Sequence, residues 1–392
     1  MDPLLTGEQA VLGAVLLDPR QLGGLDWLEP RDFYRPGHQA LFAALRKLRA
    51  EGHPALSTEG AVPVAWLTDT LAEAGQQVRG LTASYLHTLV AACPRPAHAP
   101  LYGRMVLEGS IHRTIAEHAA RLLAVAREDA WQHEVRGTTA HADVLAGVLD
   151  DLAKRWGTRP RATAPRTPLP AAGEPPAAAQ AEDEQFLLSL LIHQNGAIGE
   201  VFDWLRPQDF AVPGHGQLYR CLGALHHRGE PIDPVTTLWE VQRRGLLAEG
   251  MLTEEQLGPV LRDGAAGSAE WLGEQLLRSS LTRAAAGAAQ QIAAHADDRR
   301  LAPGQLIGHA LHALGPLEEV RARWRTATSP PAPPPAAADQ AARIQAALAR
   351  SPVRPRTRAS PTPVHRELDS TAGALVGAGF GLLSPQRRPG VG

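Results

Sequence analysis

Cysteine and lysine are scarce in this sequence of 392 residues. The two cysteines, Cys93 and Cys221, lie in different parts of the chain in apolar surroundings, which argues against a disulfide framework and a cysteine-based zinc site. The only lysines are Lys47 and Lys154, and neither is preceded by glycine. The sequence therefore lacks a Gly-Xaa4-Gly-Lys phosphate-binding loop, and we expect no ATPase activity and no cofactor.

Long apolar runs are also missing. No stretch of 18 apolar residues occurs, and no basic segment followed by an apolar one opens the chain, so we expect a cytoplasmic protein with no membrane partner. The net charge of -2 argues against a surface that is wholly a nucleic-acid platform.

A repeated stretch organises the sequence. Asp-Trp-Leu-Glu-Pro-Arg-Asp-Phe at 26–33 returns as Asp-Trp-Leu-Arg-Pro-Gln-Asp-Phe at 203–210, and each copy is followed by Pro-Gly-His and an apolar helical run. We interpret the aspartates as turn caps, the aromatic residues as core, and each histidine as a helix-opening residue whose ring bonds a nearby backbone group. The residues concerned are Trp27, Asp32, Phe33, His38, Trp204, Asp209, Phe210 and His215.

The duplication extends well beyond this stretch, because Glu8-Gln9 returns as Glu184-Gln185 and Arg155-Trp156 as Arg323-Trp324. Two domains are therefore predicted at 1–157 and 182–328. A Pro/Ala-rich flexible linker is predicted at 158–181, and a disordered basic Pro-rich tail at 329–392. From residue 330 onward the tail has eight arginines and three acidic residues, an excess of five positive charges, so the rest of the chain carries an excess of seven negative charges.

Apolar periodicity predicts an all-α fold, since no segment shows sustained two-residue alternation. In the first domain, helices are expected over 8–17 with Thr6 as N-cap, and then over 21–28, 38–51, 64–73, 83–91, 101–127 and 143–156.

Few other residues suggest chemistry. We recognise no catalytic set, and His309 and His312 have i, i+3 spacing without a carboxylate or cysteine to complete a metal site. Packing within the domain is the favoured explanation for a tryptophan beside an arginine, although such a pair is also typical of interface hot spots. The candidate partner interface is Arg155, Trp156, Arg323 and Trp324, and the candidate nucleic-acid contacts in the tail are Arg354, Arg356 and Arg358.

These motifs together resemble the N-terminal domain of the DnaB-type replicative helicases. The resemblance rests on Glu-Gln at 8–9 and 184–185, the Leu-Xaa-Pro-Xaa-Asp-Phe turns, Pro-Gly-His, and Gly-Xaa-Pro at 52–54 and 229–231; the second copy departs at Ser189 and His193. It implies two tandem helical bundles, each ending in a helical hairpin. In the family this domain is non-catalytic, pairs with its neighbours through the hairpins, and contributes to the surface on which primase and loader proteins act.

The leading hypothesis is a non-enzymatic, replication-associated adaptor or modulator that binds a DnaB-type helicase, primase or loader. Within the chain, we expect residues 101–127 to pack on 269–294, so that the two copies pair through their hairpins. Two alternatives remain. One is a DNA-binding accessory protein that uses the basic tail, and the other is a diverged helicase subunit that is active only with a motor-bearing partner.

Overall fold

The computed structural model describes residues 2–57, 64–165, 178–194, 196–262, 264 and 266–329. Every regular element in these ranges is an α-helix or a short 3-10 helix, and no strand occurs among them, as the sequence predicted. Residues 1–329 form one compact unit. The predicted tail, with Arg354, Arg356 and Arg358, lies outside the described residues.

The first copy begins with α1 and ends with the hairpin of α5 and α6. Its elements are α1 (Pro3–Leu17), η1 (Pro19–Gly24), η2 (Pro30–Asp32), α2 (Pro36–Ala50), η3 (Pro54–Leu56), α3 (Val64–Gln77), α4 (Ala83–Ala92), η4 (Pro96–His98), α5 (Ala99–Gln132) and α6 (Arg136–Trp156).

The second copy has a similar succession of helices, with α8 in the place of η1, and ends with the hairpin of α12 and α13. Its elements are α7 (Ala178–His193), α8 (Ala197–Val201), η5 (Pro207–Asp209), α9 (Pro213–Arg228), α10 (Pro234–Arg243), α11 (Glu254–Arg262), α12 (Ala269–Asp297) and α13 (Pro303–Thr328).

Two predictions for the first helices were wrong. Helix α1 begins at Pro3, and its N-cap is Asp2, whose carboxylate accepts the Leu4 N–H at 3.0 Å, so Thr6 lies inside the helix. Proline suits the first helical position, which explains the earlier start. No α-helix covers 21–28, where the chain forms only the 3-10 helix Pro19–Gly24, because consecutive glycines near its end disfavour helix continuation.

Helix α1 packs closely on α4 because residue 13 is glycine. A Cβ added at Gly13 would stand 2.1 Å from the carbonyl oxygen of Leu89, a backbone atom that cannot rotate away. The contact belongs to the core that contains Leu12, Phe33 and Phe42.

Substitution of this glycine gives a direct test of the α1–α4 contact. Gly13→Ala is expected to lower the free energy of unfolding by about 1–3 kcal/mol, because the two helices must separate. Gly75→Ala is the matched control: Gly75 lies inside α3, and its added Cβ meets nothing within 4 Å. That change is expected to raise stability by up to about 1 kcal/mol. Urea denaturation followed by circular dichroism measures both, and equal effects would contradict the close contact.

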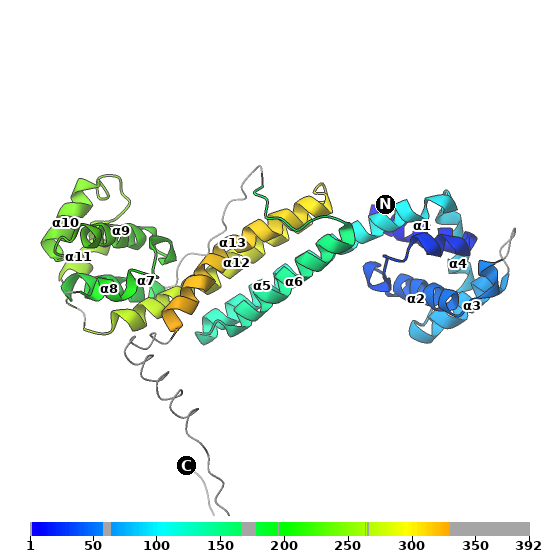
Figure 1. Ribbon diagram of the computed structural model, residues 1–392, viewed down its shortest axis with the longest axis horizontal. Coiled ribbons are helices and arrows are strands. Elements are labelled where there is room, and N and C mark those ends of the chain that lie inside the picture. Colours follow the sequence, from blue (N-terminus) through cyan, green and yellow to red (C-terminus); the bar gives the residue numbers. More distant parts are fainter. Residues whose placement is uncertain are drawn as a thin grey trace, which may run out of the picture. The chain divides into compact units, whose positions relative to one another are not determined.

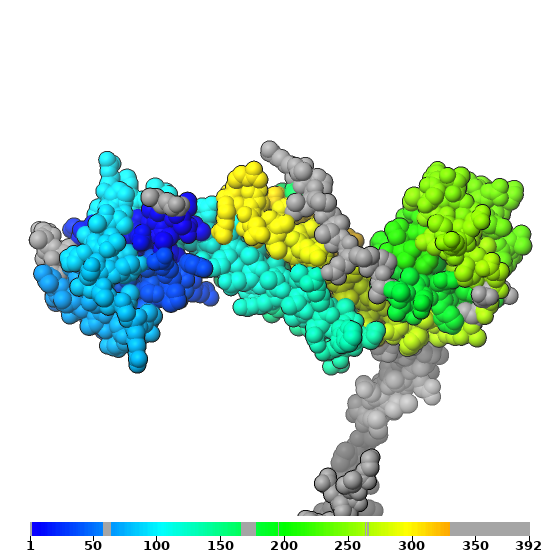
Figure 2. Space-filling model, turned by 180° about the vertical axis from the view of Figure 1, so that it is seen from behind, coloured from blue at the N-terminus to red at the C-terminus, as the bar shows by residue number. Residues whose placement is uncertain are grey.

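The two hairpins pack against each other, as the sequence predicted. Helix α5 lies along α12, and α13 packs on both α12 and α6 (Figure 1). Figure 2 shows the space-filled α5 and α12 segments, cyan and yellow, meeting side by side. Across this interface, His112 contacts the carbonyls of Ala296 and Leu301, and Arg321 forms an ion pair with Asp143.

The beginning of the predicted linker lies on the second hairpin. The Thr163 N–H donates to the Gly308 carbonyl in α13 at 2.9 Å, and a Cβ at Gly308 would lie 3.1 Å from the Arg161 carbonyl oxygen. Glycine at 308 therefore lets the two backbones approach. Helix α7 already begins at Ala178, and residues 166–177 between them lie outside the described part of the chain.

Candidate functional site: buried carboxylates and the paired hairpins

A buried carboxylate ties the first repeated turn to its hairpin. Asp32 is 1% exposed, and its Oδ2 accepts the Glu29 N–H at 2.8 Å and the Arg155 guanidinium at 2.6 Å. Its Oδ1 accepts the Ser110 hydroxyl at 3.0 Å. Arg113 donates to the Asp32 carbonyl at 2.9 Å. One turn residue thus joins η2 to both helices of the α5–α6 hairpin.

The second copy repeats this arrangement. Asp209 is fully buried and accepts the Arg206 N–H at 2.7 Å and the Ser280 hydroxyl at 2.8 Å. Both of its oxygens bind the Arg323 guanidinium, and Arg283 donates to its carbonyl at 2.5 Å. A bidentate arginine–carboxylate pair is among the stronger polar contacts in proteins, so this turn is held firmly on α12 and α13.

The candidate partner-interface residues are engaged within the chain. The side chains of Arg155 and Arg323 are only 15% and 17% exposed, because each pairs with a buried aspartate. The half-buried tryptophans beside them also pack on the core. The Arg104 Cζ lies 4.6 Å from the ring centroid of Trp156, and the Arg278 Cζ lies 5.6 Å from that of Trp324. Contact of these four residues with a partner stays a prediction.

The motif histidines bind carboxylates, where the sequence had suggested a backbone group. His38 Nδ1 lies 2.6 Å from Glu8 Oε2, and its Nε2 lies 2.7 Å from the Tyr85 hydroxyl. In the second copy, His215 Nδ1 lies 3.0 Å from Glu184 Oε2. A carboxylate that orients an imidazole is common in catalytic centres, but His38 is fully buried, so a substrate cannot reach it.

Sequence reasoning missed the role of the two glutamates. Glu8 also accepts the Tyr34 N–H, and Glu184 accepts the N–H groups of Ala211 and Val212. Each glutamate therefore fastens the first helix of its copy to the segment after the repeated turn. The available signal was that glutamate and histidine recur together, 30 residues apart in one copy and 31 in the other.

The aromatic residues of the motif take core positions. Phe33 is fully buried against Phe42, with ring centroids 4.9 Å apart, and Phe210 packs on Tyr219 at 5.1 Å. Trp204 is buried, and its indole N–H donates to the Glu200 carbonyl at 3.1 Å. Trp27 is half-buried against the same core and donates to the Gly24 carbonyl at 3.0 Å.

The thiols are poorly suited to nucleophilic chemistry. Both cysteines are free, and burial raises the pKa of the Cys221 thiol to about 11 and also raises the pKa of Cys93. In the described ranges, no group of three or more His, Cys, Asp or Glu side chains is placed to hold a metal ion. No helix among the described residues has the length and hydropathy needed to cross a membrane.

Histidines are paired inside both hairpins. His118 stacks on His141 with ring centroids 5.7 Å apart, and His295 packs on His309 at 4.9 Å. Burial lowers the pKa values of His118, His295 and His309. Neighbouring charges act in the same direction: Arg121 and His141 on His118, His309 on His295, and His312 on His309. Glu117 and Asp298 oppose the shifts of His118 and His295.

These pKa values predict that each histidine destabilises the hairpins in mild acid. Because the folded-state pKa is lowered from 6.5, the unfolded chain binds more protons as the pH falls below 6.5, and stability is lost there. His309→Phe is therefore expected to gain stability relative to the parent chain between pH 7.5 and pH 5. Melting temperatures of both proteins across this range measure the gain, with His87→Ala, on the exposed face of α4, as control. If the difference in melting temperature between His309→Phe and the parent is the same at all pH values, the pKa of His309 is not lowered in the folded chain.

Comparison with known proteins agrees with the two-copy architecture. The model of the DnaB-like helicase N terminal domain family matches residues 4–108 and 176–257. The first segment contains the first bundle and the first part of α5, and the second contains the second bundle as far as the first turn of α11. Helices α6, α12 and α13 lie beyond the matched segments.

Curated relatives include the "Replicative DNA helicase DnaB" of Geobacillus stearothermophilus, 36% identical over 119 residues, and that of Mycobacterium leprae, 37% identical over 125 residues. Each match covers 30% of this chain, and it covers 25% and 19% of the two relatives, so the match extends over no more than a quarter of either one. Among solved structures, the N-terminal domain of DnaB helicase from Mycobacterium tuberculosis is similar at 27% identity and a TM-score of 0.32, covering 36% of this chain and 97% of that one. By the family match and the repeated motifs, this chain carries the DnaB-like helicase N-terminal domain in two tandem copies.

Proposed function

We propose that this chain is a non-catalytic protein-interaction module, a replication-associated adaptor or modulator that binds a DnaB-type helicase, primase or loader. The observation that carries the proposal is the pairing of two such domains, α5 on α12, within one polypeptide. Because each hairpin is buried against the hairpin of the other copy, it is unavailable to another subunit. The outer faces of the two bundles are then left for partners.

The two lysines support a role without nucleotide hydrolysis. Lys47 pairs with Glu73 at 2.8 Å, and Lys154 pairs with Asp150 at 2.5 Å, both at the surface of helices. Neither follows a glycine-rich loop of the kind that cradles phosphates. The proposed module therefore acts by binding.

Biolayer interferometry with the immobilised full-length chain tests this function. The replicative helicase, the primase and the helicase loader of the source organism are each passed over it, with the helicase motor domain alone as control. We expect at least one partner to bind with a Kd of about 10 μM or tighter, which corresponds to roughly 7 kcal/mol. The proposal fails if none binds, or if the purified chain alone hydrolyses ATP.

A DNA-binding measurement and an activity assay separate the two alternatives. DNA binding that falls steeply with salt, and that is lost in the Arg354→Ala/Arg356→Ala/Arg358→Ala variant, would favour the DNA-binding accessory protein. ATPase or unwinding activity that appears only after mixing with the helicase would favour the diverged helicase subunit.

A further inference from the structure

Helix α10 of the second copy presents large apolar side chains to solvent. Val235, Leu238 and Trp239 are 78%, 42% and 66% exposed. Their i, i+3, i+4 spacing places them on one face of the helix. In contrast, the tryptophan of α3 in the first copy, Trp66, is fully buried and donates to the Val15 carbonyl.

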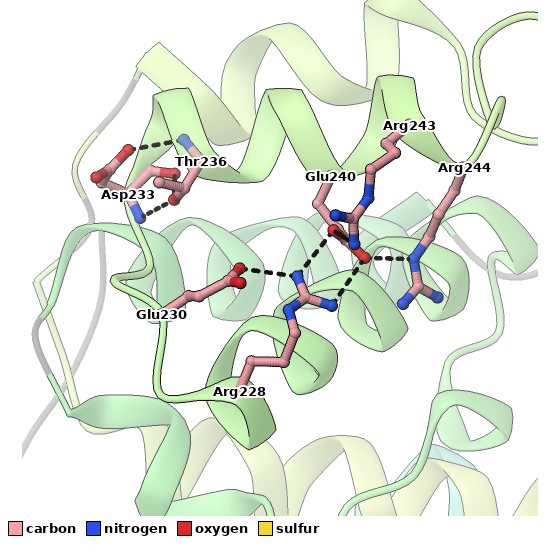
Figure 3. Close-up of polar contacts among 7 residues, drawn as sticks. All are labelled: Arg228, Glu230, Asp233, Thr236, Glu240, Arg243 and Arg244. Carbon is pink, nitrogen blue, oxygen red and sulfur yellow. Dashed lines mark hydrogen bonds and ion pairs between the residues drawn. The ribbon is translucent and has the colours of Figure 1, made fainter.

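These side chains line a groove of about 440 Å³ between α9 and α10. Its other walls come from both helices and the segment between them, and its lining includes Leu225, Glu230, Thr236, Gln242 and Arg243. The start of α10 is fixed by a reciprocal cap. Asp233 accepts the Val235 N–H at 2.8 Å. It also accepts the Thr236 N–H at 2.9 Å, and the Thr236 hydroxyl accepts the Asp233 N–H at 3.1 Å (Figure 3). The apolar face therefore stands on a firmly held helix.

Three arginines surround one buried carboxylate beside this groove. Glu240 is 1% exposed and lies 2.9 Å from Arg228, 2.8 Å from Arg243 and 2.6 Å from Arg244 (Figure 3). Arg228 also pairs with Glu230 at 2.9 Å. Because these contacts orient the guanidinium groups before any ligand arrives, little side-chain entropy remains to be lost on binding.

The charge of this cluster identifies the chemistry of its occupant. Three guanidinium groups face two carboxylates, which leaves an excess of one positive charge. Each guanidinium also has five N–H donors, so the donors far exceed the four carboxylate oxygens. A ligand that fills the groove with apolar side chains and supplies carboxylates to the rim matches both features.

Two other occupants fit less well. The chain's own tail has an excess of five positive charges, so it would meet like charge at this rim. A second copy related by a two-fold axis would bring the same arginines against each other. An acidic partner avoids both repulsions.

We propose that the groove between α9 and α10 is a docking site for an acidic amphipathic helix of a partner protein. Apolar side chains at i, i+3 and i+7 of that helix lie against Val235, Leu238 and Trp239. Its carboxylates pair with Arg243 and Arg228 at the rim. This mode of helix-in-groove recognition uses tryptophan and arginine, the residue types that dominate interface energetics. The inference deepens the proposed function by naming one contact surface and its partner chemistry.

Fluorescence polarisation with designed peptides tests the site on the full-length chain. The probe is a labelled 16-residue helical peptide with leucine and phenylalanine at i, i+3, i+4 and i+7 and glutamate elsewhere on its polar face. A second peptide has lysine at every glutamate position. We expect saturable binding of the acidic peptide and at least tenfold weaker binding of the basic one, because the rim repels it.

Variants then locate the binding. Trp239→Ala and Arg243→Glu are each expected to weaken acidic-peptide binding by about tenfold or more, and Arg243→Glu should improve binding of the basic peptide. Trp131→Ala is the matched control, since Trp131 is an exposed tryptophan at the end of α5, and it should leave binding unchanged. Circular dichroism checks that each variant keeps its helices.

Several results would overturn the proposal. The proposal fails if the acidic peptide shows no saturable binding, or if Trp131→Ala weakens that binding as much as Trp239→Ala does. It also fails if the acidic and basic peptides bind with equal affinity. Binding that appears only after removal of residues 330–392 would assign the groove to the chain's own tail. A change of oligomeric state in Trp239→Ala would assign it to a second copy. Because the peptides contain no helicase sequence, these outcomes are independent of the helicase, primase and loader binding measured above.

Discussion

Replacement of Asp32 or Asp209 by alanine is expected to lower the free energy of unfolding by about 3–5 kcal/mol, the range for breaking a buried ion pair on one side. Asp32 and Asp209 are buried, and each binds an arginine from the last helix of its hairpin. Removal of the carboxylate leaves that guanidinium without its partner in a poorly solvated position. The Ser110 or Ser280 hydroxyl and one backbone N–H lose their acceptor as well.

The two copies are expected to respond unequally. Arg323 reaches both oxygens of Asp209, whereas one hydrogen bond joins Arg155 to Asp32. Asp209→Ala should therefore cost more than Asp32→Ala, since a bidentate pair contributes two charge-assisted hydrogen bonds. Urea denaturation followed by circular dichroism, with hydrogen exchange to locate the loss, measures the difference.

The matched control is Asp143→Ala, which removes the carboxylate that pairs with Arg321. The Asp143 side chain is 61% exposed, so the change should cost less than about 1 kcal/mol. A second variant, Asp209→Leu with Arg323→Met, removes both charges and should recover much of the loss from Asp209→Ala. If Asp209→Ala costs no more than Asp143→Ala, the buried cluster does not hold the turn on the hairpin.

The repeated motif predicted the fold because its signals are local. Apolar spacing and proline and glycine positions indicated the main helices, and duplication of the whole pattern predicted two domains. The resemblance to the helicase N-terminal domain implied that each domain ends in a helical hairpin. The segment at 21–28 shows the limit of this reasoning. Its apolar residues fit a helix, but Gly23 and Gly24 interrupt it, and Leu22 and Leu25 reach the core from a 3-10 turn.

Long-range pairing was the part that the sequence predicted least well. Arg155 and Asp32 are 123 residues apart, and Arg323 and Asp209 are 114 apart, so spacing within a helix or turn gives no sign of either pair. Because the internal partner of each arginine could not be recognised, the arginine beside a tryptophan was interpreted as a candidate partner interface. The recurrence of both the aspartate and the arginine in each copy was the only sequence signal that they meet.

His112 is expected to be the most important single side chain in the pairing of the two hairpins. It lies in α5 and is 2% exposed. Its Nδ1 lies 2.8 Å from the Ala296 carbonyl oxygen, and its Nε2 lies 3.0 Å from that of Leu301. Both partners are carbonyl acceptors, so a ring N–H directed at either of them donates to it. Ala296 is in the last turn of α12, so His112 contacts the end of the helix with which α5 pairs.

The second copy has no equivalent of this contact. Alignment of Ser110 with Ser280 places Thr282 opposite His112, and the Thr282 hydroxyl donates to the Ser279 carbonyl of its own helix at 3.1 Å. The pairing is therefore asymmetric at this point. His112→Leu removes the ring nitrogens that contact these two carbonyls, and the expected cost is about 2–4 kcal/mol.

After cleavage between the two copies, weaker pairing of the hairpins can be measured as dissociation of the two halves. With a protease site inserted between residues 166 and 177, the cleaved parent halves are expected to co-elute in size exclusion at micromolar concentration, because the hairpins still pair. Once the tether is cut, the halves lose the effective concentration of about a millimolar that it provides, and they must associate at micromolar concentration. The weakened contact of the His112→Leu halves should therefore let them separate. His87→Ala, an exposed histidine on α4, should behave as the parent. If the His112→Leu halves co-elute as the parent halves do, the apolar contact of α5 with α12 is sufficient for pairing without this histidine.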